Sequence, residues 1–237
     1  MGLTEDLRKR AEVLEIDFIG FCPVGSLDGA PEDRGPGVYL GDALSIVSIG
    51  YRLNYSPIQN LPASRSAYML EHNYANKHLD QSSHKIARFL EKRGFKAMGF
   101  DAGAGFYAKI GKSPEIIAGD FSHKHAAVAS GLGKFGLNNL VLSPKLGPRI
   151  RLTTIVTNAR LEYSGVPEEN VCLADECVKC IEICPVHALD GWKGKYDPEE
   201  GWVMDKRKCY DYAFTTLKGQ RCGLCIKVCP VGVNSNT

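Results

Sequence analysis

The chain has 237 residues, of which 29 are Lys or Arg and 27 are Asp or Glu, so its formal net charge is only +2. This balance gives no electrostatic signature of binding to DNA or to an anionic membrane. With 44% hydrophobic and 24% charged residues, the composition is globular and not that of a disordered chain. No apolar run of about 18 residues is present, and a charged segment follows Met1, so we expect neither a membrane span nor export but a cytoplasmic protein.

Helices and strands alternate over the first 160 residues. Leu3, Leu7, Ala11 and Leu14 recur at helical spacing and predict a first helix at 3–15. The following elements, in chain order, are a strand at 17–22, a loop at 25–42, a buried strand at 43–51, a helix at 67–92 that Gly94 ends, a strand at 95–100, a helix near 122–130, and strands at 140–142 and 150–157. The apolar face expected for the helix at 67–92 comprises Leu70, Tyr74, His78, Leu79, Ile86, Phe89 and Leu90. This alternation is typical of a layered α/β domain.

Composition changes near residues 163–167, after which the chain is rich in Cys, Lys and Gly. We therefore predict two domains, an α/β cofactor-binding domain at 1–163 and a small domain at 164–237. Eight of the nine cysteines lie between Cys172 and Cys229. Because the count is odd and no secretion signal is present, metal ligation is a better explanation of this cluster than a disulfide framework.

Two copies of the pattern C-x2-C-x3-C-P begin at Cys177 and at Cys222. In bacterial ferredoxins the closely spaced cysteines of such a motif hold one 4Fe–4S cube, and the cysteine before proline ligates the other cube. The first predicted ligand set is Cys172, Cys177, Cys180 and Cys229. The second predicted ligand set is Cys184, Cys209, Cys222 and Cys225. Structural zinc is the alternative, but zinc sites do not require the trailing C-x3-C-P.

Cys172 departs from the ferredoxin spacing. The usual first cysteine would stand at Ala174, so this chain has C-x4-C in place of C-x2-C. A small loop would bring Cys172 to the cluster, whereas a three-iron cluster or ligation by Asp175 are the alternatives that the spacing leaves open.

Three other features suggest sites and have plainer explanations. Residues 131–136 match G-x-G-x-x-G, but a helix is predicted before them and a strand after them, the reverse of a dinucleotide-binding loop. The glycines then serve a tight turn or the close approach of a large flat ligand. His123 and His125 lie at a predicted helix start, where capping or a surface position is favoured over metal binding. Cys22, in an apolar strand, is expected to be a buried small hydrophobe.

The segment 123–136 is similar to the A-G-L-G-W-x-G-K segment of epoxyqueuosine reductases, and the two ferredoxin motifs follow at a similar distance. Residues 205–212 resemble the A-R-R-C-I-S-Y segment of that family, and reductive dehalogenases share the same general plan. The resemblance implies a base-off cobalamin in a nitroreductase-like α/β domain, followed by a ferredoxin-like domain with two 4Fe–4S clusters that pass electrons to cobalt. The expected protein is an anaerobic oxidoreductase.

The resemblance also implies site residues around the 131–142 segment. The expected cofactor-binding residues are His123, His125, Ser130, Gly131, Gly133, Lys134, Gly136, Asn138, Asn139 and Leu140. The candidate proton donors beside them are Asp120, Tyr107 and Lys109, with His123 as a further candidate. The family's catalytic aspartate aligns with Ile117, which leaves Asp120 as the nearest carboxylate.

Epoxyqueuosine reductases continue beyond the second motif into helical repeats that hold tRNA, whereas this chain ends eight residues after Cys229. We therefore expect a small-molecule or modified-nucleoside substrate in place of tRNA, and an external electron donor of the flavodoxin or ferredoxin type. Two alternatives are an electron-transfer protein without catalytic activity, and a true epoxyqueuosine reductase whose tRNA is positioned by a separate subunit.

Overall fold

The structure is a computed structural model, which describes residues 2–103, 119–201 and 203–233. The chain forms two compact units. The first comprises residues 1–51, 75–132 and 151–167, and the second comprises 52–74, 133–150 and 168–237. Residues 52–74 and 133–150 belong to the same unit as the cysteine-rich segment. A division of the chain into two domains at residue 163 stays a prediction.

A four-stranded sheet of order β1-β2-β6-β3 forms the centre of the first unit. Its strands are β1 Phe18–Pro23, β2 Ser45–Arg52, β3 Ala97–Gly99 and β6 Ile150–Thr157. β1 pairs antiparallel with β2, with Phe21 opposite Val47, and β3 pairs antiparallel with β6, with Met98 opposite Val156. The bounds of these four strands match the predicted strands to within a few residues. The prediction succeeded because runs of β-branched apolar residues favour strands of a sheet that is buried on both faces.

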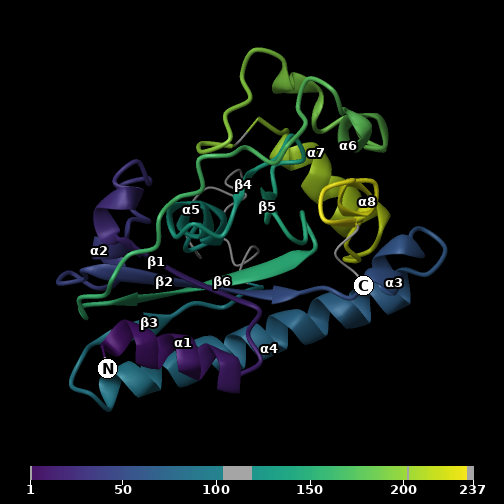
Figure 1. The fold of residues 1–237 in the computed structure, drawn as a ribbon. Helices are drawn as coiled ribbons and strands as arrows, with labels where there is room; N and C mark the ends of the chain where they lie inside the picture. Colours follow the sequence, from purple (N-terminus) through teal and green to yellow (C-terminus); the bar gives the residue numbers. More distant parts are fainter. Residues whose placement is uncertain (1, 104–118, 202, 234–237) are drawn as a thin grey trace. The chain divides into compact units, whose positions relative to one another are not determined.

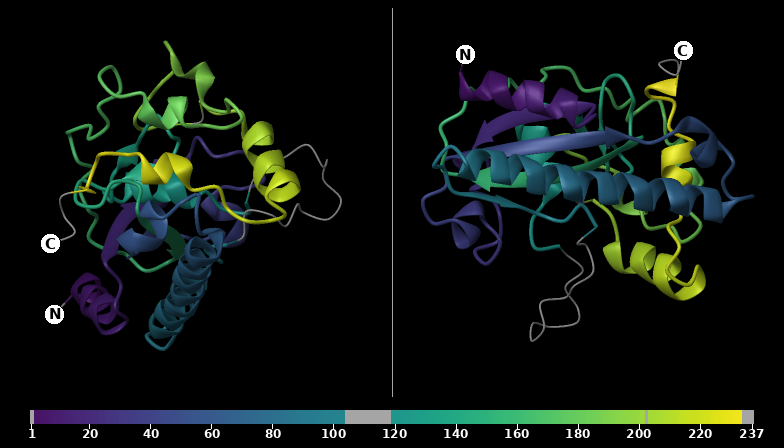
Figure 2. Two further views of the ribbon diagram at one scale, coloured as in Figure 1. Left: turned by 90° about the vertical axis from the view of Figure 1, so that its right-hand side faces the viewer. Right: turned by 90° about the horizontal axis from the view of Figure 1, so that it is seen from below.

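Helices cover both faces of this sheet (Figure 1). The helices are α1 Leu3–Val13, α4 Arg65–Glu91, whose residues from Ala75 onward belong to this unit, and α5 His123–Ala129. α1 and α4 lie side by side on one face (Figure 2), where they bury Leu7 and Leu79 against Val47 and Ile155. α5 lies on the other face, where Cys22 is buried with Ile46, Val156 and Ala126. The buried position predicted for Cys22 is confirmed at 1% exposure.

The apolar face predicted for α4 is wrong in its first turns. Leu70 and Tyr74 are 73% and 58% exposed, whereas Tyr68 and Ala75 are buried. The first ten residues of this helix belong to the second unit and the rest to the first. The two parts of one helix therefore bury different stripes, which a single periodicity does not describe.

The second unit is built from short elements. They are α3 Tyr55–Gln59, β4 Lys134–Phe135, β5 Val141–Leu142, α6 Lys179–Glu182, η2 Asp190–Trp192, α7 Lys206–Asp211, η3 Tyr212–Thr216 and α8 Leu224–Lys227. β4 and β5 form a two-stranded antiparallel ribbon in which Lys134 lies opposite Leu142. The strand predicted at 140–142 is confirmed, and a helix, α5, precedes the Gly131–Gly136 segment as predicted, so the segment lacks the context of a dinucleotide-binding loop.

Two further elements, η1 Val24–Leu27 and α2 Pro36–Tyr39, lie within or beside the predicted loop at 25–42. Across the described residues, no helix combines the length and the apolar character needed to span a membrane. Taken together, the sheet with helices on both faces and the small cysteine-rich part confirm the predicted α/β fold class.

Candidate metal centres and neighbouring residues

A cavity in the second unit is lined by Cys172, Cys177, Cys180 and Cys229. These are the four cysteines of the first predicted set. The remaining lining is largely apolar and comprises Leu137, Asn138, Leu142, Leu173, Lys179, Pro230 and Val231. The fold thus brings together one cysteine from before the first motif, two from within it and one from the end of the second.

The electrostatics of the first set show the same grouping. Burial, and after it the neighbouring Cys172, Cys229 and Cys177, raise the pKa of the Cys180 thiol to about 12. Burial also raises the pKa of Cys229, which has Cys172 and Cys177 as charged neighbours. Four thiolates at such close quarters repel one another, and a bound metal centre offsets that repulsion.

The second predicted set is grouped around Cys225. Burial raises the pKa of this thiol, and the next causes are its neighbours Cys222, Cys209, Cys180 and Cys184. Three of those four are the other members of the second set. Cys209 is exposed and the other three members of this set are partly buried, whereas Cys180 and Cys229 of the first set are fully buried.

Short local signals position these cysteines. The Asp205 side chain accepts a hydrogen bond from the Lys208 backbone N–H (3.0 Å) and so caps α7, which carries Cys209. In the second motif Gly223 has φ +71° and lies against Leu61 and Tyr68, so this left-handed turn between Cys222 and Cys225 requires glycine.

Two arginines that the sequence did not single out hold the backbone beside the cysteines. Arg149 is 1% exposed and donates to the carbonyl oxygens of Cys229 (2.8 Å), Val231 (2.7 Å) and Leu146 (3.1 Å). Arg65 donates to the carbonyls of Cys222 (3.1 Å) and Arg221 (3.4 Å). Each ligand set therefore has one member whose carbonyl is bound by a guanidinium. No local sequence pattern predicts such long-range contacts.

The donor chemistry of both sets fits iron–sulfur clusters, because four thiols are what one cube requires. Among the residues that the structure describes, no group of three or more His, Cys, Asp or Glu meets the geometry for holding a single metal ion. When bound, the two clusters would each carry one electron at a time.

Residues assigned to the corrin fall in both units. In the first, His123 bonds to the Thr154 hydroxyl (2.9 Å) and to the Asp101 carbonyl (3.1 Å), and burial lowers the pKa of its imidazole to about 4. His123 is therefore neutral at pH 7. The Asp120 carbonyl accepts a hydrogen bond from the Tyr39 hydroxyl, which leaves the Asp120 carboxyl outside this contact.

The other corrin candidates of the first unit also contact the protein itself. His125 pairs with the Ser122 hydroxyl (2.6 Å), and the buried Ser130 hydroxyl donates to Ser48 (3.2 Å). At Gly131, which has φ +78°, a side chain would overlap the carbonyl of Gly165.

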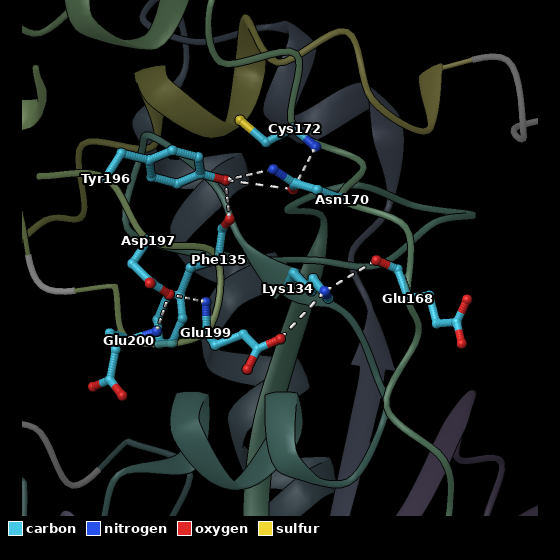
Figure 3. A network of polar contacts seen from close by, with 9 residues as sticks. All are labelled: Lys134, Phe135, Glu168, Asn170, Cys172, Tyr196, Asp197, Glu199 and Glu200. Carbon is cyan, nitrogen blue, oxygen red and sulfur yellow. Dashed lines mark hydrogen bonds and ion pairs between the residues drawn. The ribbon is translucent and has the colours of Figure 1, made fainter. Parts of the chain in front are cut away.

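In the second unit, Lys134 is buried and donates to the Glu168 carbonyl (3.2 Å) and to the Glu199 carboxylate (3.4 Å; Figure 3). The Asn138 side chain accepts from the Leu140 backbone N–H (3.1 Å). Gly133, just before β4, and Gly136, in the turn between β4 and β5, face Leu142, and Asn139 in the same turn has φ +58°.

These contacts account for the positions of the described candidate residues through the chain's own packing. The role of these residues in cofactor binding stays a prediction. Tyr107 and Lys109, the other candidate proton donors, lie outside the described residues.

Residues 173–232 match the family described as a 4Fe-4S double cluster binding domain. The match begins one residue after Cys172. It supports the prediction of two clusters and leaves the fourth ligand of the first cluster to be identified.

The chain is 27% identical over 202 residues to a tetrachloroethene reductive dehalogenase of Desulfitobacterium hafniense, covering 78% of this chain and 32% of that protein. It is 24% identical over 221 residues to an epoxyqueuosine reductase of Synechococcus sp. (strain CC9605), covering 85% of this chain and 60% of that protein. A solved reductive dehalogenase, described as informing a mechanism of B12-dependent dehalogenation, superposes with a TM-score of 0.71 at 20% identity, over 96% of this chain and 32% of that one.

The chain therefore resembles the epoxyqueuosine reductases and reductive dehalogenases in sequence and in fold, as the 123–136 and cysteine segments predicted. These relatives are oxidoreductases by name. The chain spans about a third of the length of the dehalogenase relatives and 60% of the epoxyqueuosine reductase.

Proposed function

We propose that this chain is an iron–sulfur reductase of the epoxyqueuosine reductase type, in which two 4Fe–4S clusters pass electrons to a base-off cobalamin and on to a small-molecule or modified-nucleoside substrate. The observation that carries the proposal is the grouping of eight cysteines into two sets of four within one compact unit. The likeness to reductases supports the catalytic part. A corrinoid, when bound, would supply a reduced cobalt centre.

The chain's own residues would have three tasks. The cysteines hold the clusters, and the buried apolar lining of the first set limits the access of water, which influences the reduction potential. Asp120 is the proposed proton donor among the described candidates, because it is the carboxylate of the described residues that lies nearest in sequence to Ile117, the position with which the catalytic aspartate of the epoxyqueuosine reductases aligns; it would take a proton from water and pass it to the substrate. The electron donor is proposed to be an external flavodoxin or ferredoxin.

The first test is metal content. The protein is purified anaerobically and incubated with hydroxocobalamin, and iron and cobalt per chain are measured. About eight iron atoms with one cobalt would support the reductase, whereas about eight iron atoms without cobalt would end the corrin assignment. Cys209→Ala is a useful companion, since it should lower iron and leave any cobalt in place.

The second test concerns the proton donor. Asp120→Asn should lower the turnover of a cobalamin-loaded enzyme at least about 100-fold while iron and cobalt contents stay unchanged. Full activity in this variant would remove Asp120 from the mechanism. Asp101→Asn, in the same unit, is the matched control.

A second candidate function is electron transfer without catalysis. The exposed Cys209 favours it, because a cluster at the surface exchanges electrons readily with a partner protein. Iron without cobalt, together with rapid reduction by a ferredoxin, would select this alternative. Normal queuosine in tRNA from a deletion strain would exclude a role in epoxyqueuosine reduction.

A further inference from the structure

The spacing of Cys172 in the sequence does not decide whether this residue is a ligand of the first cluster. It stands two residues further from Cys177 than the ferredoxin pattern requires, and the double-cluster family match begins after it. Yet Cys172 lines the same cavity as Cys177, Cys180 and Cys229, whereas Asp175 is exposed and does not line it.

The additional residues are taken up in a tight turn. The Leu173 carbonyl accepts hydrogen bonds from the backbone N–H groups of Glu176 (2.9 Å) and Cys177 (2.7 Å). This single turn of helix shortens the path between the two cysteines. It also directs Asp175 to solvent, which removes the acid that the spacing offered as an alternative ligand.

A second set of contacts fixes the backbone on the other side of Cys172 (Figure 3). The Cys172 N–H donates to Asn170 Oδ1 (3.1 Å), and the Asn170 Nδ2 donates to the Tyr196 hydroxyl (3.3 Å). That hydroxyl donates in turn to the carbonyl of Phe135 (2.6 Å), a fully buried residue of β4.

Both chain segments that supply these contacts are themselves anchored to β4. Lys134 binds the Glu168 carbonyl just before Asn170, and the Phe135 N–H donates to the Pro198 carbonyl (2.8 Å) just after Tyr196. The Asp197 carboxylate accepts from the N–H groups of Glu199 (2.7 Å) and Glu200 (2.9 Å) and so fixes the next turn. Asn170 and Tyr196 therefore have little freedom to move away from Cys172.

We propose that Asn170 and Tyr196 form a clasp that holds Cys172 as the fourth ligand of the first cluster, in place of the cysteine that the ferredoxin pattern has two residues later. Both are positioning residues, and this role rests on the proposed two-cluster function. Cys172 is near enough to Tyr196 to interact with it electrostatically, so the clasp also adds a polar neighbour to this ligand.

The test compares oxidative loss of iron among variants of the anaerobically purified full chain. Ferricyanide takes one electron from the cluster, a 4Fe–4S centre of charge +2 becomes a 3Fe–4S centre of charge +1, and one Fe²⁺ leaves. Electron paramagnetic resonance detects the three-iron product and a colorimetric assay counts the iron. Neither readout requires cobalamin, so failure of the corrin proposal does not affect this test, and absence of iron from the wild-type chain would refute the proposed function itself.

Cys172→Ala should hold about seven iron atoms before any oxidant is added, because its first cluster lacks the ligand for the fourth iron, and the first equivalent of ferricyanide should oxidise this three-iron centre to the form that electron paramagnetic resonance detects. Tyr196→Phe and Asn170→Ala should retain about eight iron atoms and form the product about tenfold faster than the wild type, because Cys172 would be held less firmly against the iron that leaves. Asp175→Ala should behave as the wild type. Tyr210→Phe, which changes the residue after Cys209 in the second set, is the matched control.

Two outcomes would overturn the proposal. If Cys172→Ala keeps both clusters intact, or if Asp175→Ala alone gives the three-iron product, Cys172 is not the ligand. If Tyr196→Phe and Asn170→Ala both lose iron at the wild-type rate, the clasp does not hold it. Should Tyr196→Phe not fold, Asn170→Ala decides, because it leaves the Tyr196 bond to Phe135 in place.

Discussion

The two compact units of this chain are stabilised in different ways. The first has a sheet with an apolar cluster on each face, and helices of 11 and 27 residues contribute to one of them. In the second, helices α6 and α8 have four residues each, and one apolar cluster is formed around cysteines, with Cys172, Cys180, Cys184 and Cys225 among its members. Burial of apolar surface stabilises the first unit, whereas the part of the second unit that surrounds the cysteines depends on sulfur and on single polar contacts.

This difference predicts unequal responses to loss of iron, the largest effect we expect. Chelation under anaerobic conditions should remove the clusters and leave buried thiols with no metal to share. Hydrogen exchange should then show α6 and α8 at nearly unfolded rates, while β2 and β6 stay protected. Equal loss of protection in both units would contradict the comparison, and the iron-loaded chain is the control.

The same difference explains which parts of the molecule the sequence predicted. Strands β1, β2 and β6 were predictable because their residues alternate or run apolar and bury both faces. The grouping of the cysteines was predictable because sulfur spacing follows cluster geometry. The first turns of α4 were not, because Leu70 is exposed in a unit whose packing involves residues far along the chain.

Hydrogen bonds from polar side chains to backbone carbonyls far away in the sequence could not be predicted either. Arg149 reaches the carbonyls of Cys229 and Val231 across about 80 positions, and Tyr196 reaches that of Phe135 across 61. Every residue has a backbone carbonyl, so the type of the accepting residue does not indicate that its carbonyl receives a hydrogen bond from a side chain. Such contacts become visible only once the fold is known.

Arg149 provides a prediction of intermediate size. Arg149→Met should lower the free energy of unfolding by about 3 kcal/mol, because buried carbonyls lose their donor and a buried cation beside the first set is lost. Urea unfolding of the anaerobic, iron-loaded protein measures this. The matched variant Arg65→Met, at a partly exposed residue beside the second set, should cost about 1 kcal/mol.

Potentiometry separates the electrostatic part of the Arg149 effect. Loss of this cation should lower the reduction potential of the first cluster and leave the second unchanged, whereas Arg149→Lys should restore most of the potential. An equal shift in both clusters would show that the arginine acts on the whole unit and not on the set beside it.

The smallest expected effect belongs to the first unit and depends on pH. His123 has a folded-state pKa of about 4, below its ordinary value of 6.5, because burial penalises the charged imidazole. The unfolded chain therefore binds more protons between these two values, so the unfolding free energy rises with pH across this window. The contribution is complete above pH 6.5 and is lost as the pH falls towards 4. Since the ring is partly exposed, we expect about 1 to 2 kcal/mol.

His123→Asn should remove this pH dependence while keeping a polar side chain near Thr154 and the Asp101 carbonyl. The measurement is the difference in unfolding free energy between variant and wild type from pH 5 to pH 7, which cancels acid effects on the clusters because both proteins carry them. His84→Asn, at an exposed position on α4, is the control and should leave the slope unchanged. A wild-type slope in His123→Asn would assign the acid sensitivity to the cysteine-rich unit. The sensitivity of the chain to acid, like its expected sensitivity to loss of iron, would then lie in the unit that sulfur, and not the sheet, stabilises.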